Sequence, residues 1–376
     1  MKTWHSRLLF VVMLAGTLGV LSMVGAAPGP PPSGRPKVRI SFQAYKGSLR
    51  SVAFSSDSKK LFSLGDDENF TAKLWDAETG KHITTFLGAR IGKKRAGEKL
   101  SEAIGGVAVL SPDGKRIASA GIDRSIRLWD VATGKKLATL EQPEGGLPAL
   151  LLFSPDGKEL LSLGSTSYLW KLETKKERLV MEGLNMEGTN QRLLKAVAFD
   201  PRGTPHVITW DNWSNPPSFH LWTPASKKTI AVSFKIPIHN SVSFYSRDFA
   251  FSPDCQTIAS ALGDGSIRLW DAATGENTAT LKNLPGQPFD LMFSPDGKLL
   301  TACYTHPRKR DALPEDPVRR FVCIHDVATG KVLAKLEGDP DLILPFAFSP
   351  DGRTLATGDG GSKITLWSLP SRYKAE

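Results

Sequence analysis

The residue types that most often carry out chemistry are present in this chain but scattered. The seven histidines stand at no metal-ligand spacing, and no Gly-x-Ser-x-Gly motif or phosphate-binding glycine loop occurs. The three cysteines include no Cys-x-x-Cys pair. The acids that recur at regular spacing sit in Ser-Pro-Asp-Gly turns, where an aspartate bonds the nearby backbone. The sequence therefore predicts a protein without catalytic residues, metal or cofactor.

From Val38 onward, one pattern of strands and turns recurs seven times. An apolar strand leads into a Ser-Pro-Asp-Gly turn, a second strand follows, and a third ends in Leu-Trp-Asp before Thr-Gly-Lys. Pro fixes φ at the second turn position, and Gly takes the positive φ that follows. The turns begin at Ser55, Ser111, Ser154, Asp200, Ser252, Ser294 and Ser349. A unit is about 47 residues long, close to the ~40–45 of a four-stranded propeller blade.

In this order and period, the motifs Phe-Ser-Pro-Asp-Gly-Lys, Ile-Arg-Leu-Trp-Asp and Ala-Thr-Gly-Lys resemble WD40 repeats, particularly the bacterial type rich in Ser-Pro-Asp-Gly. The resemblance implies an all-β fold, a seven-bladed WD40-like β-propeller. The last unit stops after three strands, at Lys363–Leu369, whereas Lys37–Phe42 is a strand without a unit. Because an open sheet edge invites aggregation, we predict that this N-terminal strand closes the last blade.

One feature of the family is absent, since no Gly-His dipeptide occurs in the chain. In many WD40 proteins that His joins Asp, Ser and Trp in a buried hydrogen-bond network. Without it, we expect less polar cross-linking in each blade and stability that rests on apolar packing. A buried Trp indole still needs an acceptor. His325 stands in the Trp place of the sixth unit and is expected to fill the core.

The resemblance also implies a binding surface. In WD40 proteins, one rim position of each blade, just before the inner strand, often meets partners on the upper face. The matching positions are Arg50, Gly105, Ala149, Lys195, Arg247, Phe289 and Leu344. Arg50, Lys195 and Arg247 would form a basic part, and Phe289 and Leu344 an apolar part, suited to an acidic protein or peptide. Ordinary rim packing with solvated charge is the alternative.

Cys303 and Cys323 flank a long insertion in the sixth unit, Tyr304–Arg320. The matching positions of the second unit, Ala120 and Arg127, face each other if a two-residue turn joins their strands. Facing cysteines could form a disulfide that closes the insertion and contributes about 3 kcal/mol in an exported protein. A slip of one residue in the register would instead leave two reduced thiols.

The first 36 residues have the composition of an export segment followed by a spacer. Lys2 and Arg7 precede an apolar run over residues 8–27, and Val24 and Ala26 stand at the spacing that a signal peptidase reads. A run of this length could also remain as a membrane anchor. Both interpretations place the body in the periplasm or outside the cell, since the positive flank stays inside.

These observations divide the chain into a signal peptide, a Pro-rich linker, a propeller and a tail, at residues 1–26, 27–36, 37–369 and 370–376. We predict a non-enzymatic scaffold for protein–protein interaction. The alternative is a propeller enzyme or small-ligand binder, with His, Asp and Glu converging at the central channel.

The net charge of +10 does not indicate a nucleic-acid-binding protein, because the cations are spread over the chain without an aromatic-interleaved stripe. Anionic lipid head groups and envelope polymers are the nonspecific contacts that this charge favours. Attachment to a membrane is expected only if the N-terminal segment is not cleaved.

Overall fold

The structure is a computed structural model. It describes residues 35–370 apart from 66–70, 87–106, 121–123, 142–147, 149, 165–166, 176–177, 186–192, 212–217, 223–248, 306–319 and 337–344. The described residues form strands and turns, and no helix among them could cross a membrane. The predicted signal peptide, residues 1–26, lies outside the described residues, as do most of the predicted linker and tail.

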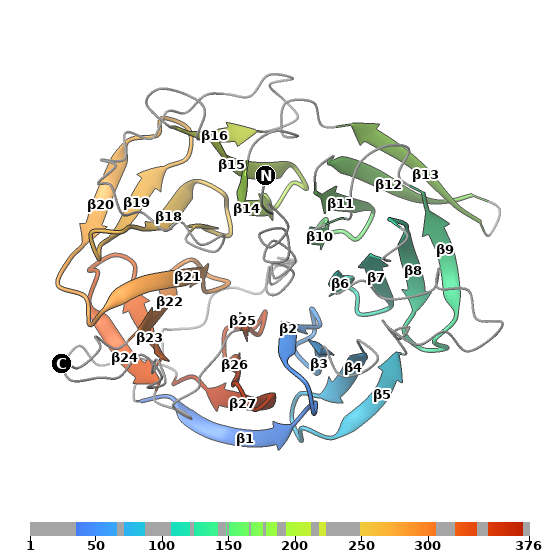
Figure 1. The fold of residues 1–376 in the computed structure, drawn as a ribbon, viewed down its shortest axis with the longest axis horizontal. Coiled ribbons are helices and arrows are strands. Elements are labelled where there is room, and N and C mark those ends of the chain that lie inside the picture. Colours follow the sequence, from blue (N-terminus) through green and yellow to red (C-terminus); the bar gives the residue numbers. More distant parts are fainter. Residues whose placement is uncertain are drawn as a thin grey trace, which may run out of the picture.

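The strands form seven antiparallel sheets, which we number in chain order of their inner strands (Figure 1). Sheet 1 contains β2 (Leu49–Phe54), β3 (Lys60–Gly65), β4 (Ala72–Asp76) and β5 (His82–Phe86), and sheet 2 contains β6 (Val107–Leu110), β7 (Arg116–Ala120), β8 (Ile126–Asp130) and β9 (Lys136–Leu140). Sheet 3 contains β10 (Leu150–Phe153), β11 (Glu159–Leu163), β12 (Tyr168–Lys175) and β13 (Arg178–Asn185), and the described part of sheet 4 contains β14 (Leu193–Phe199), β15 (Pro205–Asp211) and β16 (Ser218–Trp222). Sheet 5 contains β17 (Phe249–Phe251), β18 (Thr257–Ala261), β19 (Ile267–Asp271) and β20 (Asn277–Leu281), and sheet 6 contains β21 (Gln287–Phe293), β22 (Leu299–Thr305), β23 (Arg320–Asp326) and β24 (Val332–Leu336). Sheet 7 contains β25 (Phe346–Phe348), β26 (Thr354–Gly358), β27 (Lys363–Ser368) and β1 (Lys37–Gln43).

Neighbouring sheets pack face to face, and an apolar cluster fills each interface. Trp170 of sheet 3, for example, packs in one cluster with Leu128 of sheet 2. Sheet 1 packs in the same way on sheet 7, because Trp75 shares a cluster with Leu366. Seven such clusters occur, one between each sheet and the next. Figure 1 shows the sheets set around a common centre, with β2, β6, β10, β14 and β25 innermost.

The N-terminal strand β1 contacts two sheets at once. Its backbone pairs antiparallel with β27 over Lys37–Gln43, which is the pairing that the sequence predicts. Its side chains reach sheet 1: the Phe42 ring lies 4.7 Å from the Trp75 ring, and Arg39 donates to the carbonyl of Ala77. β1 therefore links the last sheet to the first through both backbone and side-chain contacts.

The Ser-Pro-Asp-Gly turns have the local geometry that their residues predict. In sheet 2 the Ser111 hydroxyl donates to the Asp113 carboxylate at 2.5 Å and accepts from the amide of Arg116, while the amide of Lys115 also donates to Asp113. The fourth turn position has a positive φ in all seven sheets, and five of these residues are glycines. The seven are Ser58, Gly114, Gly157, Gly203, Cys255, Gly297 and Gly352.

The central tryptophans find their acceptors on the neighbouring strand of the same sheet. In five sheets the indole Nε1 donates to a Ser or Thr hydroxyl at 2.8–2.9 Å. The pairs are Trp75 with Ser63, Trp129 with Ser119, Trp170 with Ser162, Trp270 with Ser260, and Trp367 with Thr357. In these five sheets the polar cross-link is therefore a Trp–hydroxyl pair, without the family's histidine.

In sheet 1 a tyrosine extends this pair. The hydroxyl of Tyr45, which is 2% exposed, lies 2.8 Å from the Ser63 hydroxyl that accepts from Trp75. The Tyr45 ring occupies the space beside Gly65, where an added Cβ would lie 2.3 Å from ring atom Cδ1. Gly65 is therefore needed for the close approach of this ring.

Of the two possibilities for Cys303 and Cys323, the structure fits the one-residue slip that leaves two separate thiols, and not the disulfide. Cys303 pairs with Val322 and Cys323 with Ala302, so the two cysteines are one residue out of register. Since adjacent residues of a strand point to opposite faces, Cys303 lies in the interface with sheet 7 and Cys323 in the interface with sheet 5. All three cysteines are buried, and none of them forms a disulfide.

We predict that Ser260→Ala lowers the free energy of unfolding by about 1–3 kcal/mol, because it leaves the buried Trp270 indole without its acceptor. Urea unfolding followed by tryptophan fluorescence measures the change. Ser56→Ala, at an exposed turn position, is the matched control and should change stability little. Equal losses in the two variants would show that the indole bond contributes nothing.

We also predict that all three cysteines are thiols. Alkylation of the protein unfolded without reductant should modify three residues, as counted by mass spectrometry. The same count is expected after reduction. A gain of two modified residues on reduction would contradict the register of β22 and β23.

Candidate functional site

The predicted rim positions that the structure describes lie near the start of the innermost strands β2, β14 and β21. We call this end of the ring the upper end, and the end with the Ser-Pro-Asp-Gly and Thr-Gly-Lys turns the lower end. Arg50 is the second residue of β2 and is half-buried. Leu49 pairs with Gly65 and Ser51 with Leu64, so Arg50 is the extra residue of a β-bulge. A bulge re-aims a side chain out of the regular ladder, and it sets Arg50 apart from the packed residues on either side.

The same bulge occurs in sheet 4. Leu194 pairs with Thr209 and Ala196 with Ile208, which leaves Lys195 as the extra residue of β14. Arg50 and Lys195 thus occupy equivalent backbone positions in sheets 1 and 4. The other predicted rim residues, Gly105, Ala149, Arg247 and Leu344, lie outside the described residues.

In sheet 6 the bulge is one residue further along the strand. Phe289 pairs with Cys303 and Leu291 with Ala302, so the extra residue of β21 is Asp290. Asp290 is 4% exposed and has a φ of 55°. As the extra residue of the bulge, Asp290 and not Phe289 is therefore the structural equivalent of Arg50. No signal in the sequence distinguishes these adjacent residues, because the motif is counted back from the end of the strand.

Phe289 itself is half-buried against the cluster between sheets 6 and 7. The guanidinium carbon of Arg320, the first residue of β23, lies 5.6 Å from the centre of its ring. A cation over an aromatic face is attracted by the ring quadrupole. The upper end of sheet 6 therefore combines Phe289 with Arg320 and Asp290, two residues that sequence reasoning missed.

The repeated aspartates are engaged in turn structure. Burial alone would raise the pKa of Asp113, but hydrogen bonds from the Ser111 hydroxyl and the Lys115 amide outweigh it, and the pKa is lowered. The pKa of Asp130 is lowered by bonds from the hydroxyl and amide of Thr133 in the Thr-Gly-Lys turn. Both carboxylates stay ionised and serve as acceptors for local backbone and hydroxyl donors.

A histidine, an aspartate and a cysteine lie close together where sheets 4 and 5 meet. The His206 imidazole lies 3.7 Å from the Asp200 carboxylate, and Cys255 packs in the same interface. Burial raises the pKa of the Cys255 thiol to about 12, so the thiol remains protonated and is not a nucleophile. Among the described residues, no group of three or more His, Cys, Asp or Glu side chains could hold a metal ion.

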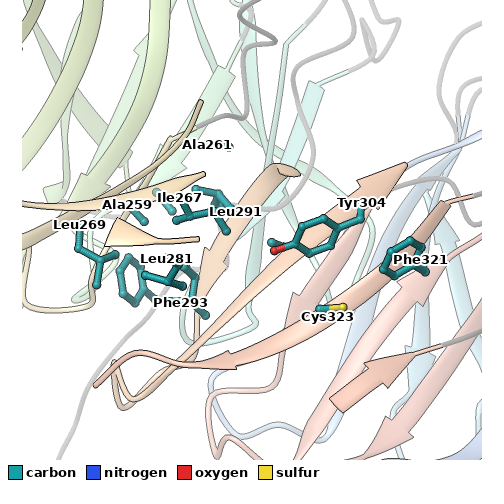
Figure 2. Packing of buried hydrophobic residues seen from close by; sticks show 13 residues of the cluster. Ala259, Ala261, Ile267, Leu269, Leu281, Leu291, Phe293, Tyr304, Phe321 and Cys323 are labelled. Atoms are coloured by element: carbon teal, nitrogen blue, oxygen red, sulfur yellow. The ribbon is translucent and has the colours of Figure 1, made fainter. Parts of the chain in front are cut away.

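In sheet 6, His325 stands where the other sheets have the central Trp, and its hydrogen-bond partner is a tyrosine instead of a Ser or Thr. Its Nε2 lies 2.8 Å from the hydroxyl of Tyr304, whereas Ala302 stands where the other sheets have the acceptor hydroxyl. Figure 2 shows Tyr304 and Phe321 in the apolar cluster beside sheet 5. The two rings stack with centroids 5.5 Å apart. His325 is fully buried, and burial lowers its pKa to about 4. It fills the core, as the sequence predicts.

These features define a class of protein: an all-β repeat protein of four-stranded antiparallel sheets. Four segments match the family model "WD domain, G-beta repeat" (WD40), at residues 36–76, 97–130, 234–271 and 331–368. The first spans β1 of sheet 7 and β2–β4 of sheet 1, and the last spans β24 of sheet 6 and β25–β27 of sheet 7. A sequence repeat is therefore out of phase with a sheet and ties two neighbours together.

The chain is similar to several eukaryotic WD proteins. It is 25% identical to the chicken (Gallus gallus) serine-threonine kinase receptor-associated protein over 264 residues, or 69% of this chain and 64% of that protein. It is 26% identical to eukaryotic translation initiation factor 3 subunit I of Emericella nidulans, over 68% of this chain and 60% of that protein. It is 23% identical to the protein LST8 homolog of Drosophila pseudoobscura pseudoobscura, over 67% and 74%. The chain thus spans less than two thirds of the first two relatives.

We predict that the buried His325 makes stability fall in mild acid. Its pKa is about 4 when folded and near 6.5 when unfolded, so the unfolded chain binds the proton more readily between these values. The stability contributed by the neutral imidazole is complete above about pH 6.5 and is lost as pH falls to about 4, by a few kcal/mol in all. Urea unfolding at several pH values measures this slope.

His325→Gln should flatten the slope over this window, whereas the exposed control His82→Gln should leave it unchanged. Burial alone would raise the pKa of Asp113, but its hydrogen bonds lower it below its usual value of 3.8, so this carboxylate loses its contribution mainly below about pH 5, at the acid edge of the window. An unchanged slope in His325→Gln would refute the assignment.

Proposed function

We propose that the chain forms a seven-bladed WD40-like β-propeller of the bacterial Ser-Pro-Asp-Gly-rich type, closed by β1, which acts outside the cytoplasm as a scaffold for protein–protein interaction. The seven sheets, the apolar cluster shared by sheets 7 and 1, and the β1–β27 ladder support the closed ring. Four unaltered Ser-Pro-Asp-Gly turns support the type. The apolar run over residues 8–27 supports export, by a cleaved signal or as an anchor.

The scaffold role rests on the similarity to WD proteins. The names of two relatives describe a receptor-associated protein and a subunit of a factor, both of which associate with other proteins. Among the described residues, Asp113 accepts hydrogen bonds within its turn, and Cys255 and His325 are buried in interfaces between sheets. These observations favour a role in binding another protein over a role in catalysis.

We place the binding surface at the upper end, on the inner strands. The observation that carries this proposal is the shared bulge, which puts the cations Arg50 and Lys195 at one equivalent position of sheets 1 and 4. Arg247 matches this position in the motif of the fifth unit. Cations at several inner strands favour an acidic segment of a partner, because opposite charges speed the encounter and select the partner.

Charge reversal at Arg50 and Arg247 should abolish capture of the partner. The partner is first isolated from envelope fractions on the immobilised chain and identified by mass spectrometry, and its affinity for purified variants is then measured by calorimetry. Loss of both cations should weaken binding by about tenfold or more, since truncating one charge of a buried pair costs 2–5 kcal/mol.

The matched control reverses Lys115 and Lys298, which are exposed beside the Ser-Pro-Asp-Gly turns of the lower end. Because Arg50 is half-buried, Arg50→Gln serves as the milder variant, and thermal unfolding checks that each protein is folded. Equal affinity of the Arg50/Arg247 and control variants for the partner would exclude the upper rim as the binding surface.

A further inference from the structure

The exposed large apolar side chains of the described residues are not scattered over the surface. They number four: Val38, 55% exposed, Ile83, 47%, Leu137, 48%, and Val332, 45%. Each lies on the outermost strand of its sheet, on β1, β5, β9 or β24. These strands belong to sheets 7, 1, 2 and 6, which are consecutive around the ring (Figure 1). We call these four residues, with the cations described below, the outer arc.

The four side chains also lie at the same level between the upper and the lower end of the sheets. Val38 and Val332 pair directly with Trp367 and His325, the central residues of their sheets. Ile83 follows the residue that pairs with Trp75 and is the extra residue of a bulge, and Leu137 has the same place in sheet 2. All four therefore lie near the start of the outer strand, at the lower end of the ring.

Exposed cations accompany each of these apolar side chains. Lys37 and Arg39 flank Val38, Lys331 precedes Val332, and Lys81 and Lys135 stand two residues before Ile83 and Leu137. The four outer strands contain no acidic residue. Carboxylates occur in the turns that precede these strands. Asp76, for example, accepts hydrogen bonds from the amide and the hydroxyl of Thr79 in its turn. Glu78 is the exposed acid of these turns within the described residues.

Sheet 5 shows that the pattern is not a general property of outer strands. Its strand β20 begins with Asn277 and Thr278 and follows Glu276, so the same position is polar and adjoins an acid. Thr278 is the bulge residue that corresponds to Ile83 and Leu137. The apolar and basic pattern ends where sheet 6 gives way to sheet 5.

We propose that the outer arc docks on a membrane surface that carries anionic phospholipid head groups. Apolar side chains with neighbouring Lys or Arg are the combination that binds such an interface, because apolar groups enter the boundary region and cations attract anionic lipid. A protein partner would need a continuous apolar surface, whereas these side chains are separated by the spacing between sheets.

The position of β1 supports this occupant. β1 lies in the middle of the arc, and it follows directly after the linker that leads from the apolar run over residues 8–27. If that run stays in a membrane, the arc is the first part of the folded body to meet the lipid. The outer arc is at the lower end, so a docked protein leaves the upper rim accessible. The inference does not depend on the scaffold proposal.

The test uses the chain from Pro28 onward, which contains every described strand. Co-sedimentation should show binding to vesicles of phosphatidylcholine with about 30% phosphatidylglycerol, and little binding to phosphatidylcholine alone. Binding should weaken as salt is added, because salt screens the head-group charge. No binding to the anionic vesicles, or equal binding to both, overturns the proposal.

Two variants locate the contact. Lys81→Glu with Lys135→Glu and Lys331→Glu should reduce partition onto anionic vesicles about a hundredfold or more, since each cation near the surface is worth about fivefold. Val38→Ser with Ile83→Ser and Val332→Ser should also reduce binding at unchanged charge. All six side chains are exposed, so the variants should fold, and thermal unfolding verifies this.

The control makes the same charge change at the upper end, with Lys46→Glu, Lys282→Glu and Lys363→Glu, all at exposed positions. It should lower partition far less than the arc variant does. Equal losses in the two charge variants would show a nonspecific effect of net charge and overturn the proposal. Light scattering tests the other occupant: a dimer that the arc variants convert to monomers, without vesicle binding, would assign the arc to a second copy of this chain.

Discussion

The structure depends on one constraint: each sheet is apolar on both faces and must be covered on both sides. Strands such as β10 and β25 are buried along their whole length, so a single sheet would leave much of its apolar area in water. A row of sheets covers all faces except the first and the last. The cluster that Trp75 shares with Leu366 covers those two, and β1 holds them together. Two-sided burial thus favours the placement of the sheets side by side around a common centre (Figure 1), and stability is shared among interfaces between neighbours.

In this arrangement, some regions of the molecule tolerate a change of residue type better than others. The interfaces are tightly filled, and their polar groups are paired, as the indole of Trp270 is with Ser260 and His325 is with Tyr304. The lower end is made of repeated turns whose aspartates bind local donors. Residues at the upper ends of the inner strands, and residues on the outer strands, take less part in interface packing and in turn hydrogen bonds. Residues there, including Arg50 and the outer arc, can differ between sheets without breaking the packing, and for this reason the candidate binding surfaces lie there.

Local features were predictable from the sequence, whereas register and exact neighbours were not. Gly114 takes a positive φ because its turn requires it, and β1 pairs with β27 because β1 belonged to no unit and the last unit lacked an outer strand beside β27. The sequence left open whether Cys303 and Cys323 face each other, because no local rule fixes the register. In the structure Ser119, not Ala120, faces Arg127 in sheet 2, and the same slip separates the two cysteines. Phe289 was chosen by counting along a motif, but the bulge at Asp290 shifts that count by one residue.

The sequence by itself determined the strands, the turns and the repeat, because turn residues and alternating apolar residues act over a few neighbouring positions. The tertiary structure decided which groups meet across longer distances. Tyr45 completes the Ser63–Trp75 pair only because Gly65 leaves room for its ring. Exposed apolar residues from four sheets form one arc only because the sheets are consecutive in the ring. Such contacts depend on packing between units, and packing is a property of the whole fold that no single repeat encodes.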